Sequence, residues 1–315
     1  MRALCVRRPG ARTTVEDLGR ADAARHGIPP GGAFDGIALR AANRLVGNRD
    51  DAAGLELTLL GPELENAGDE TILAALAGAP WGLELLRAGE ALPLEVARPF
   101  AIGPGERLRL GAARGGLRGW LAVAGGVDVP LVLGSRATCA AGRFGGIGGR
   151  ALVAGDLLPI GAVEGSPASV GWRDPFARTD DVPCLALLPG PQVDRFAADL
   201  LERLCAAPWE VDAASDRVGI RLRPRDGASP LEGGHGIPPE GTTLGAIQVP
   251  PDGAPIVLGP DRPVTGGYAK PALVARAHLG LLASLRPGDV LRFAQATLER
   301  AVALARERLD ALPPR

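Results

Sequence analysis

The chain has 315 residues, enough for two domains with buried cores, and its 35 basic and 36 acidic side chains nearly cancel. This balance disfavours nucleic acid or an anionic membrane as a partner, and the 46% hydrophobic content is typical of a folded protein. No window of about 18 uninterrupted apolar residues occurs, which excludes a transmembrane helix, and 45 Gly with 29 Pro argue against a mostly helical protein.

Three segments have the apolar spacing of helices. In residues 36–46, Asp35 can cap the first turn and Gly47 lies where a helix would end. Residues 191–207 and 295–312 show the same period. These are the few helices that the sequence predicts.

Most of the remaining chain consists of short apolar runs separated by Gly and Pro, which is typical of strands in sandwiches and barrels. We therefore predict a mainly β protein with a few short helices. The predicted strands are residues 55–60, 71–77, 106–111, 119–124, 157–160, 184–188, 246–249, 255–258 and 289–293.

Matching segments recur in the two halves in the same order. Residues 51–57 and 216–222 share the pattern D-x-x-G-[LI]-x-L. Residues 104–110 and 287–293 both begin with Pro-Gly, an acidic residue and an apolar run. Ordered matches of this kind indicate two related β lobes that arose by duplication.

A polar stretch containing Gly and Pro, residues 162–183, separates the two halves and is the candidate linker. We predict an N-terminal lobe over residues 1–170. A C-terminal lobe over residues 171–315 would end in the predicted C-terminal helix.

Cysteine and histidine usage points to neither disulfides nor a metal site. The four cysteines are far apart, and the start of the chain has no hydrophobic segment behind its charge, so we expect a cytoplasmic protein with reduced thiols. His26, His235 and His278 are isolated, and we expect structural or surface roles for them.

One lysine, Lys270, stands among 34 arginines. An ammonium is a compact point charge that can donate to a single oxygen, whereas guanidinium is a broad planar fork. Either this position rejects Arg or the lysine has survived by chance in an Arg-biased chain. A phosphate-binding P-loop is excluded, because Lys270 follows Ala269 and not the required Gly.

Two polar segments lie in the first half. The first carries Asp17, Arg20, Asp35 and Asn43, and Asp35 is either a helix cap or a catalytic carboxylate. In the second, Arg136 lies in a stretch with little other charge, which suits either a ligand carboxylate or phosphate or a buried ion pair.

A third polar segment in the second half is the best single candidate site. If residues 268–270 are extended, Tyr268 and Lys270 project from the same face of the strand, with Arg262 and Thr265 nearby. Gln248 lies in an apolar run of the same half. Together these groups could bind and polarise an oxyanion.

At these residues the sequence resembles the allophanate hydrolase subunit 2 family, also called biotin-dependent carboxyltransferase-like. The family includes the C subunit of bacterial 5-oxoprolinase, KipA-type regulators and half of the urea amidolyase carboxyltransferase domain. The matching stretches are residues 13–20 (TTVEDLGR), 42–48 (ANRLVGN), 55–58 (LELT), 61–62, 121–128 (LAVAGGVD), 133–136 (LGSR), 188–192 (LPGPQ), 215–219 (SDRVG), 245–250 (GAIQVP) and 265–268 (TGGY).

The resemblance implies two cyclophilin-like β-barrel lobes and a hetero-oligomeric enzyme. Its members usually act with a partner related to allophanate hydrolase subunit 1, which serves as the B subunit. In 5-oxoprolinase, the B and C subunits are thought to phosphorylate the lactam of 5-oxo-L-proline with ATP and Mg²⁺, before the A subunit hydrolyses it.

The resemblance also implies roles for individual residues. Lys270 with Arg136 or Arg262 would neutralise phosphate and the substrate carboxylate, and Asp17 or Asp35 would orient the lactam N–H or a metal ion. The other candidate substrate- or phosphate-binding residues are Arg20, Asn43, Gln248, Thr265 and Tyr268.

Two alternatives stay open at this point. One is carboxyl transfer from carboxybiotin carried by another chain, since the only Met is Met1 and the usual Met-Lys-Met carrier pattern is absent. The other is a non-catalytic KipA-like regulator that binds a kinase-inhibitor partner.

Overall fold

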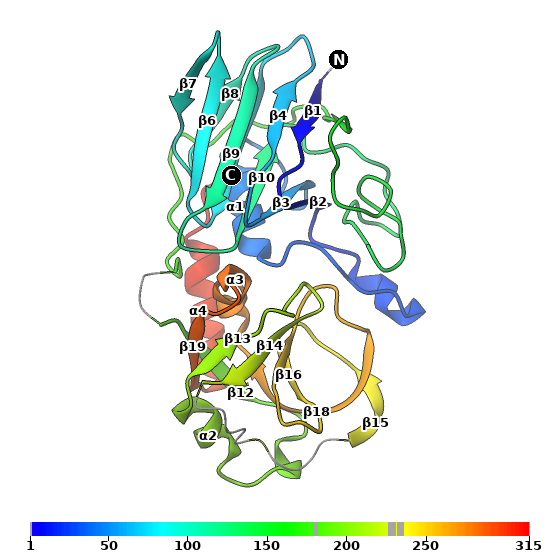
Figure 1. The fold of residues 1–315 in the computed structure, drawn as a ribbon, viewed down its shortest axis with the longest axis vertical. Helices are drawn as coiled ribbons and strands as arrows, with labels where there is room; N and C mark the ends of the chain where they lie inside the picture. Colours follow the sequence, from blue (N-terminus) through cyan, green and yellow to red (C-terminus); the bar gives the residue numbers. More distant parts are fainter. Residues whose placement is uncertain (1, 179–181, 226–230, 232–235, 315) are drawn as a thin grey trace. The chain divides into compact units, whose positions relative to one another are not determined.

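The computed structural model describes residues 2–178, 182–225, 231 and 236–314, and it is mainly β, as predicted (Figure 1). It divides into two units. The first consists of Met1–Arg20, Gly31–Ala177 and Asp310–Arg315, and the second of Ala21–Pro30 and Arg178–Leu309. The main break thus follows Ala177 and lies within the candidate linker.

The first unit contains two antiparallel sheets. Its strands are β1 (Ala3–Arg8), β2 (Arg12–Glu16), β3 (Gly54–Thr58), β4 (Glu63–Asn66), β5 (Ile72–Gly78), β6 (Trp81–Arg87), β7 (Glu90–Pro93), β8 (Phe100–Ile102), β9 (Arg107–Ala113), β10 (Arg118–Val123) and β11 (Leu157–Pro159). One sheet has the order β11-β1-β4-β9-β6-β7 and the other the order β2-β3-β10-β5-β8.

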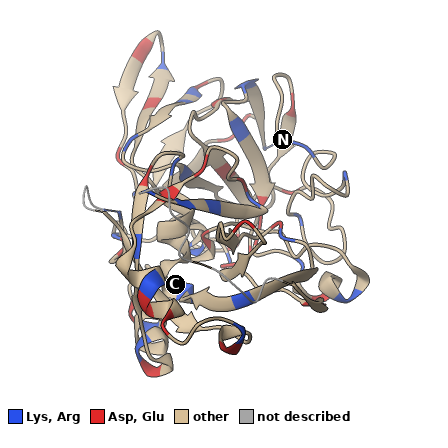
Figure 2. Cartoon of the chain, turned by 60° about the horizontal axis from the view of Figure 1, so that its bottom comes forward, with Lys and Arg blue, Asp and Glu red and all other residues tan. Residues whose placement is uncertain are grey.

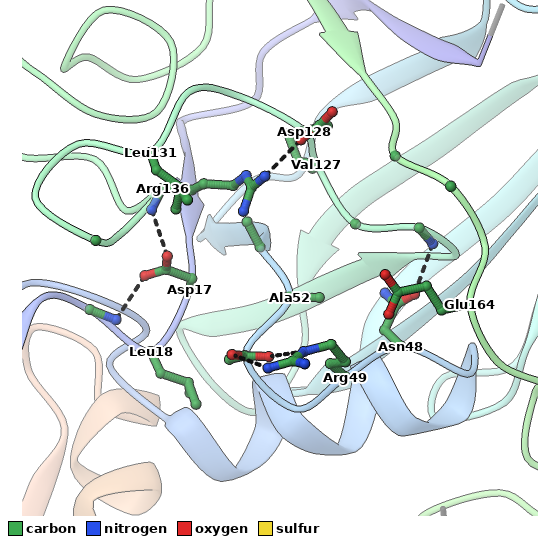
Figure 3. A pocket seen from close by; sticks show the side chains of 18 residues that line it. Asp17, Leu18, Asn48, Arg49, Ala52, Val127, Asp128, Leu131, Arg136 and Glu164 are labelled. Atoms are coloured by element: carbon green, nitrogen blue, oxygen red, sulfur yellow. Dashed lines mark hydrogen bonds and ion pairs between the residues drawn. The ribbon is translucent and has the colours of Figure 1, made fainter.

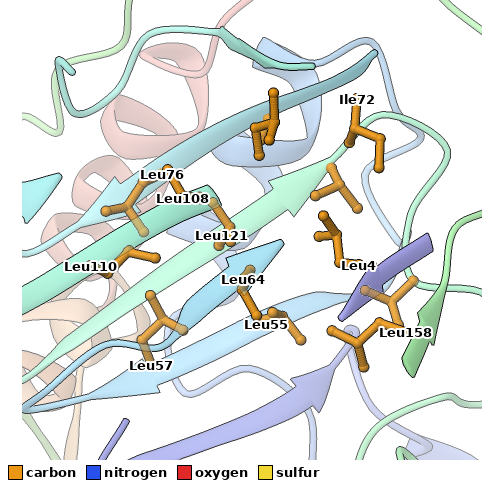
Figure 4. Packing of buried hydrophobic residues seen from close by; sticks show 14 of the residues in the cluster. Leu4, Leu55, Leu57, Leu64, Ile72, Leu76, Leu108, Leu110, Leu121 and Leu158 are labelled. Carbon is orange, nitrogen blue, oxygen red and sulfur yellow. The ribbon is translucent and has the colours of Figure 1, made fainter. Parts of the chain in front are cut away.

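Both sheets contribute to one hydrophobic core (Figure 4). Leu4 and Leu64 reach it from β1 and β4, and Leu55 and Leu121 reach it from β3 and β10. In β3 the alternate residues Leu55 and Leu57 belong to this core, so one face of the strand supplies its apolar side chains. This core fixes the sheets whose connecting loops form the pocket described below.

Helix α1 (Gly36–Leu45) packs on β10 and β5 of the first unit. The Asp35 carboxylate accepts hydrogen bonds from the backbone N–H groups of Ile37 (3.1 Å) and Ala38 (3.2 Å), so the predicted helix cap is confirmed. Gly47 follows the helix end at a φ of +79°. The sequence prediction for this helix is therefore confirmed at both ends.

The second unit is a closed barrel. Its strands are β12 (Cys184–Pro189), β13 (Trp209–Val211), β14 (Gly219–Pro224), β15 (Gly236–Gly241), β16 (Ala246–Val249), β17 (Ile256–Leu258), β18 (Thr265–Val274) and β19 (Val290–Gln295). Seven of them pair in the order β12-β19-β13-β14-β17-β16-β18, and pairing of β12 with β18 closes the ring. Strand β15 is added outside the ring along β18.

Helical segments of the second unit are short, apart from α4 (Leu298–Asp310), which confirms the predicted C-terminal helix. The others are α2 (Leu200–Ala206), α3 (Leu279–Ser284), η1 (Ala21–His26), η2 (Val193–Arg195) and η3 (Arg276–His278). The single helix predicted over 191–207 is wrong, because Phe196 is extended and buried and separates η2 from α2. Within the described ranges, no helix combines the length and apolar character needed to cross a membrane.

The repeated sequence segments have the same local structure in each unit. In the first match, Gly54 begins β3 and Gly219 begins β14. In the second, a Pro-Gly turn precedes β9 and β19, and its glycine has a positive φ of +73° at Gly105 and +85° at Gly288. Each match is therefore a turn or strand start of the same kind, as expected for a duplication.

Charges of both signs are interspersed along the elements (Figure 2). On β9 and β4, Arg107 lies 2.8 Å from Glu65 and Arg109 lies 3.5 Å from Glu63. The charges that cancel in the composition therefore also pair locally on this sheet.

Candidate functional site

A polar pocket of about 510 Å³ lies in the first unit (Figure 3). Its walls come from four loop segments, residues 17–19, 48–53, 125–136 and 161–164. Most belong to stretches that carry the family resemblance, so motifs far apart in the sequence meet at one place. Its volume lies in the range of small-molecule sites.

Asp17 joins two of these walls. Its carboxylate accepts hydrogen bonds from the backbone N–H groups of Gly19 (2.8 Å) and Arg136 (2.6 Å) (Figure 3). It also accepts one from the Ser135 hydroxyl (2.6 Å). Asp17 is buried, and three protein donors occupy its oxygens. These contacts give Asp17 a positioning role between the two loops, and its catalytic role stays a prediction.

Two asparagines hold the opposite wall. The side-chain amide of Asn43 donates to the Ala52 carbonyl (2.8 Å), and its oxygen accepts from the amide of Asn48 (3.0 Å). The Asn48 amide also donates to Val123 O (2.7 Å), and its oxygen accepts from Gly125 N (2.8 Å). Asn43, predicted to bind substrate, is fully buried, whereas Asn48 lines the pocket.

Asn48 was not singled out from the sequence, although it ends the quoted stretch of residues 42–48. Its position at the end of a helix-forming segment gives no sign that its amide reaches β10 and the following turn. Only the fold brings these parts together.

The pocket's cations are paired with carboxylates. Arg136 donates to Asp128 (2.7 Å) and to the Val129 carbonyl (2.8 Å). Arg49 donates to Asp51 (3.1 Å), which holds the pKa of that carboxyl below its usual range. Because the Arg136 pair is partly exposed and the Arg49 pair is exposed, each is held weakly, and an anionic ligand can compete for either guanidinium.

Close backbone approach shapes one edge of the pocket. Gly125 has a φ of +97°, and a Cβ atom there would lie 2.1 Å from the Gly161 carbonyl oxygen. Gly161 N in turn donates to Gly126 O (3.1 Å). Any side chain at position 125 would therefore separate the two loops.

Two other predicted residues of the first half do not line the pocket. Asp35 caps α1, as described above. Arg20 is buried, donates to the Ala137 carbonyl and lies 5.2 Å from the Phe144 ring centroid. Its guanidinium therefore secures a loop of the first unit.

Strand β18 of the second unit carries three predicted residues. It is extended, as the sequence argument required. Thr265 and Tyr268 are exposed, whereas Lys270 is 3% exposed. The tyrosine and the lysine therefore lie in different environments.

Gln248 and Arg262 are largely buried in the same unit. A Cβ atom on Gly266 would lie 2.5 Å from the side-chain nitrogen of Gln248, so the glycine leaves room for that amide. Arg262 donates to the Gly259 carbonyl at 3.4 Å, and burial lowers the pKa of its guanidinium. Of the predicted residues in this unit, Gln248, Thr265, Tyr268 and Lys270 lie on the neighbouring strands β16 and β18.

Two residues beside Lys270 were missed from the sequence. Glu240 Oε1 lies 2.7 Å from Lys270 Nζ, and Gln192 donates to the same oxygen at 2.8 Å. Gln192 Oε1 also accepts from the backbone N–H of Lys270 (3.1 Å). Gln192 ends the quoted stretch of residues 188–192, but Glu240 lies outside all of the quoted motifs.

The histidines do not form a metal site in the described part of the chain, where no three His, Cys, Asp or Glu side chains are arranged to hold a metal ion. His278 is buried and accepts a hydrogen bond from Ala186 N (2.8 Å), which confirms its structural role. His26 is exposed, and His235 lies outside the described residues.

Comparison with known proteins supplies the family. Residues 26–295 match the model of a family described as carboxyltransferase domain, subdomain A and B. The chain is 36% identical to the C subunit of 5-oxoprolinase from Escherichia coli, covering 94% of this chain and 92% of that protein. It is 35% identical to urea amidolyase of Lachancea kluyveri over 90% of this chain, but spans only 16% of that protein.

The fold comparison agrees with the sequence comparison. The crystal structure of Kluyveromyces lactis urea carboxylase superimposes with a TM-score of 0.86 at 30% identity. The match covers 98% of this chain and 29% of the urea carboxylase chain.

Proposed function

We propose that the chain is the C subunit of an ATP-dependent 5-oxoprolinase. It belongs to the family described as carboxyltransferase domain, subdomain A and B, and two relatives of its own length are C subunits of 5-oxoprolinase. The observation that carries the proposal is the 36% identity with the E. coli protein over 94% of this chain and 92% of that protein.

The proposed reaction is the opening of the lactam ring of 5-oxo-L-proline. A resonance-stabilised amide carbon reacts only slowly with water, and it becomes a better electrophile when its oxygen is activated. Transfer of the γ-phosphoryl group from ATP to the lactam oxygen, with release of ADP, provides this activation. Water then adds to the activated carbon, and the ring C–N bond breaks as the nitrogen takes a proton, which leaves an acyl phosphate. A second water hydrolyses the acyl phosphate, and the products are glutamate and phosphate.

Charged groups of this chain would contribute mainly by binding and electrostatic stabilisation. The buried ammonium of Lys270 suits a carboxylate or phosphoryl oxygen. The Arg136 guanidinium on the pocket wall suits the same kind of group, provided that the ligand displaces Asp128. Asp17 and Asn48 would keep the pocket walls in place.

The activity would belong to a complex. The chain would act with a B subunit related to allophanate hydrolase subunit 1 and with an A subunit that completes hydrolysis. We expect it to be inactive alone, with ATP and Mg²⁺ as requirements of the assembled enzyme. The naming of two relatives as C subunits supports such partners.

The test is ATP hydrolysis by the chain combined with its A and B partners, with and without 5-oxo-L-proline. Hydrolysis stimulated by the lactam, and lost when this chain is omitted, is the expected result. No stimulation in a complex shown to be assembled by size-exclusion chromatography would contradict the proposal.

Carboxyl transfer is the second candidate, favoured by the family description and by the urea amidolyase relative. In that case carboxybiotin on another chain would donate the carboxyl group. Transfer of labelled bicarbonate carbon to an acceptor, dependent on the biotinylated partner, would favour this candidate over lactam hydrolysis.

A further inference from the structure

The ammonium of Lys270 is buried without a well-aligned hydrogen bond to any described residue. Its nearby carboxylate oxygen, Oε1 of Glu240, is close enough for an ion pair at 2.7 Å. A buried ammonium is stabilised only when an anion or several acceptors surround it. The buried ammonium of Lys270 therefore needs a nearby anion, and Glu240 meets this need only in part.

Glu240 is held much less firmly than Lys270. Its side chain is 45% exposed, and it lies on β15, which pairs only with β18 among the described strands. The pairing of β15 with β18 is irregular between Gly236 and Glu240. One side of the carboxylate thus faces Lys270 while the other faces solvent.

Gln192 connects the two charged residues. Its amide nitrogen donates to Glu240 and its oxygen accepts from the backbone N–H of Lys270. The ammonium of Lys270 and the amide of Gln192 lower the pKa of Glu240, so this carboxylate is ionised at neutral pH. The chain thereby provides its own anion at Lys270.

We infer that Glu240 is a displaceable counter-ion, whose carboxylate occupies the place that the anionic group of the ligand takes at Lys270. The inference rests on the proposed function, in which Lys270 meets a carboxylate or phosphoryl oxygen. Exchange of one anion for another leaves the buried ammonium paired throughout. The released Glu240 carboxylate needs little additional hydration, because it is already half exposed.

Exchange of this kind makes Glu240 a specificity-determining residue. A neutral lactam cannot replace a carboxylate at a buried ammonium, whereas an anion can. Gln192 acts as a positioning residue, because its amide remains available to a new acceptor when Glu240 leaves.

The single lysine allows a direct test on the isolated full-length chain. Protein labelled with ¹³C at lysine Cε gives one lysine resonance, which reports only on Lys270. The probes are 5-oxo-L-proline, which has a carboxylate, inorganic phosphate, and 2-pyrrolidinone, a lactam without charge. The variants are Glu240→Gln, and Glu210→Gln as a control with the same charge change at an exposed position of β13.

We expect at least one of the two anions to shift the Lys270 resonance. The anion concentration that gives half of the full shift should be about tenfold lower in E240Q than in the wild type. In E210Q this concentration should equal that of the wild type, and 2-pyrrolidinone should not shift the resonance in any variant. Response to 5-oxo-L-proline supports a carboxylate ligand, and response to phosphate alone supports a phosphoryl ligand.

Three results would overturn the inference. They are an equal half-shift concentration in E240Q and the wild type, an equally large decrease of that concentration in E210Q, or no shift of the Lys270 resonance by either anion in E240Q. Thermal unfolding followed by circular dichroism identifies any variant that has lost its fold, and Glu240→Ala then replaces E240Q under the same criteria. No partner protein or turnover is involved, so failure of this test is distinct from failure of the 5-oxoprolinase assay.

Discussion

Removal of the Asp17 carboxylate should destabilise the first unit strongly. In Asp17→Ala, the Ser135 hydroxyl and the backbone N–H groups of Gly19 and Arg136 all lose their common acceptor. Hydrogen bonds to a charged acceptor contribute about 1.5 to 3 kcal/mol each, and they are not additive in one network. We therefore expect a loss of about 3 to 5 kcal/mol in the free energy of unfolding.

Ser135→Ala is the matched control, because it leaves the carboxylate two of its three donors. The Ser135 hydroxyl also accepts from the Ala137 N–H (3.0 Å), so this variant removes two hydrogen bonds and should lose about 1 to 3 kcal/mol. Urea unfolding followed by tryptophan fluorescence measures both losses. In a Trp209→Phe background the remaining tryptophans all belong to the first unit, so the signal reports that unit.

The competing interpretation makes Asp17 a catalytic group. It predicts that Asp17→Ala folds with nearly wild-type stability and loses lactam-stimulated ATP hydrolysis. A loss of less than about 1 kcal/mol, no greater than that of Ser135→Ala, would refute the positioning role.

Three further predictions concern other parts of the chain. Gly125→Ala should lower the melting temperature far more than Gly134→Ala. Both glycines have positive φ, but only at position 125 would the new Cβ lie 2.1 Å from a carbonyl oxygen. Equal decreases in melting temperature would contradict this. His278 has its pKa lowered from 6.5, first by burial and then by Arg308 and Arg300, so protons bind more strongly to the unfolded chain. The free energy of unfolding should therefore fall as the pH drops below about 6.5, by at most about 1.4 kcal/mol per pH unit. Urea unfolding of His278→Asn at several pH values should show that this pH dependence is lost. Lys270→Arg should reduce lactam-stimulated ATP hydrolysis by about tenfold or more, because guanidinium cannot occupy the place of a compact ammonium, and unchanged turnover would end the proposed role of Lys270.

Sequence periodicity predicted many of the strands and the helix α1, although it missed β6 (WGLELLR), whose buried side chains alternate. All nine predicted apolar runs overlap strands, and Asp35 and Gly47 mark the ends of α1. Strands with polar or broken patterns were missed, among them β2 (RTTVE) and β15 (GIPPEG). Their pairing with β3 and β18 stabilises them, and a local window contains no trace of such pairing.

The candidate site was predictable only as separate motifs. Asp17, Asn48 and Arg136 lie in stretches quoted for the resemblance, but their joint position depends on loops from both sheets. Glu240 has no sequence signal at all, because an exposed glutamate is common and only the β15–β18 pairing places it beside Lys270. Long-range pairing, not local preference, therefore assembles both polar clusters.

Product analysis distinguishes lactam hydrolysis from carboxyl transfer when the chain is assembled with both of its partners and supplied with ¹³C-labelled 5-oxo-L-proline, ATP and bicarbonate. We expect labelled glutamate, ADP and phosphate in equal amounts, formed without biotinylated protein and lost when this chain is omitted. A carboxylated product that depends on biotinylated protein, with the lactam ring left intact, would contradict the 5-oxoprolinase function.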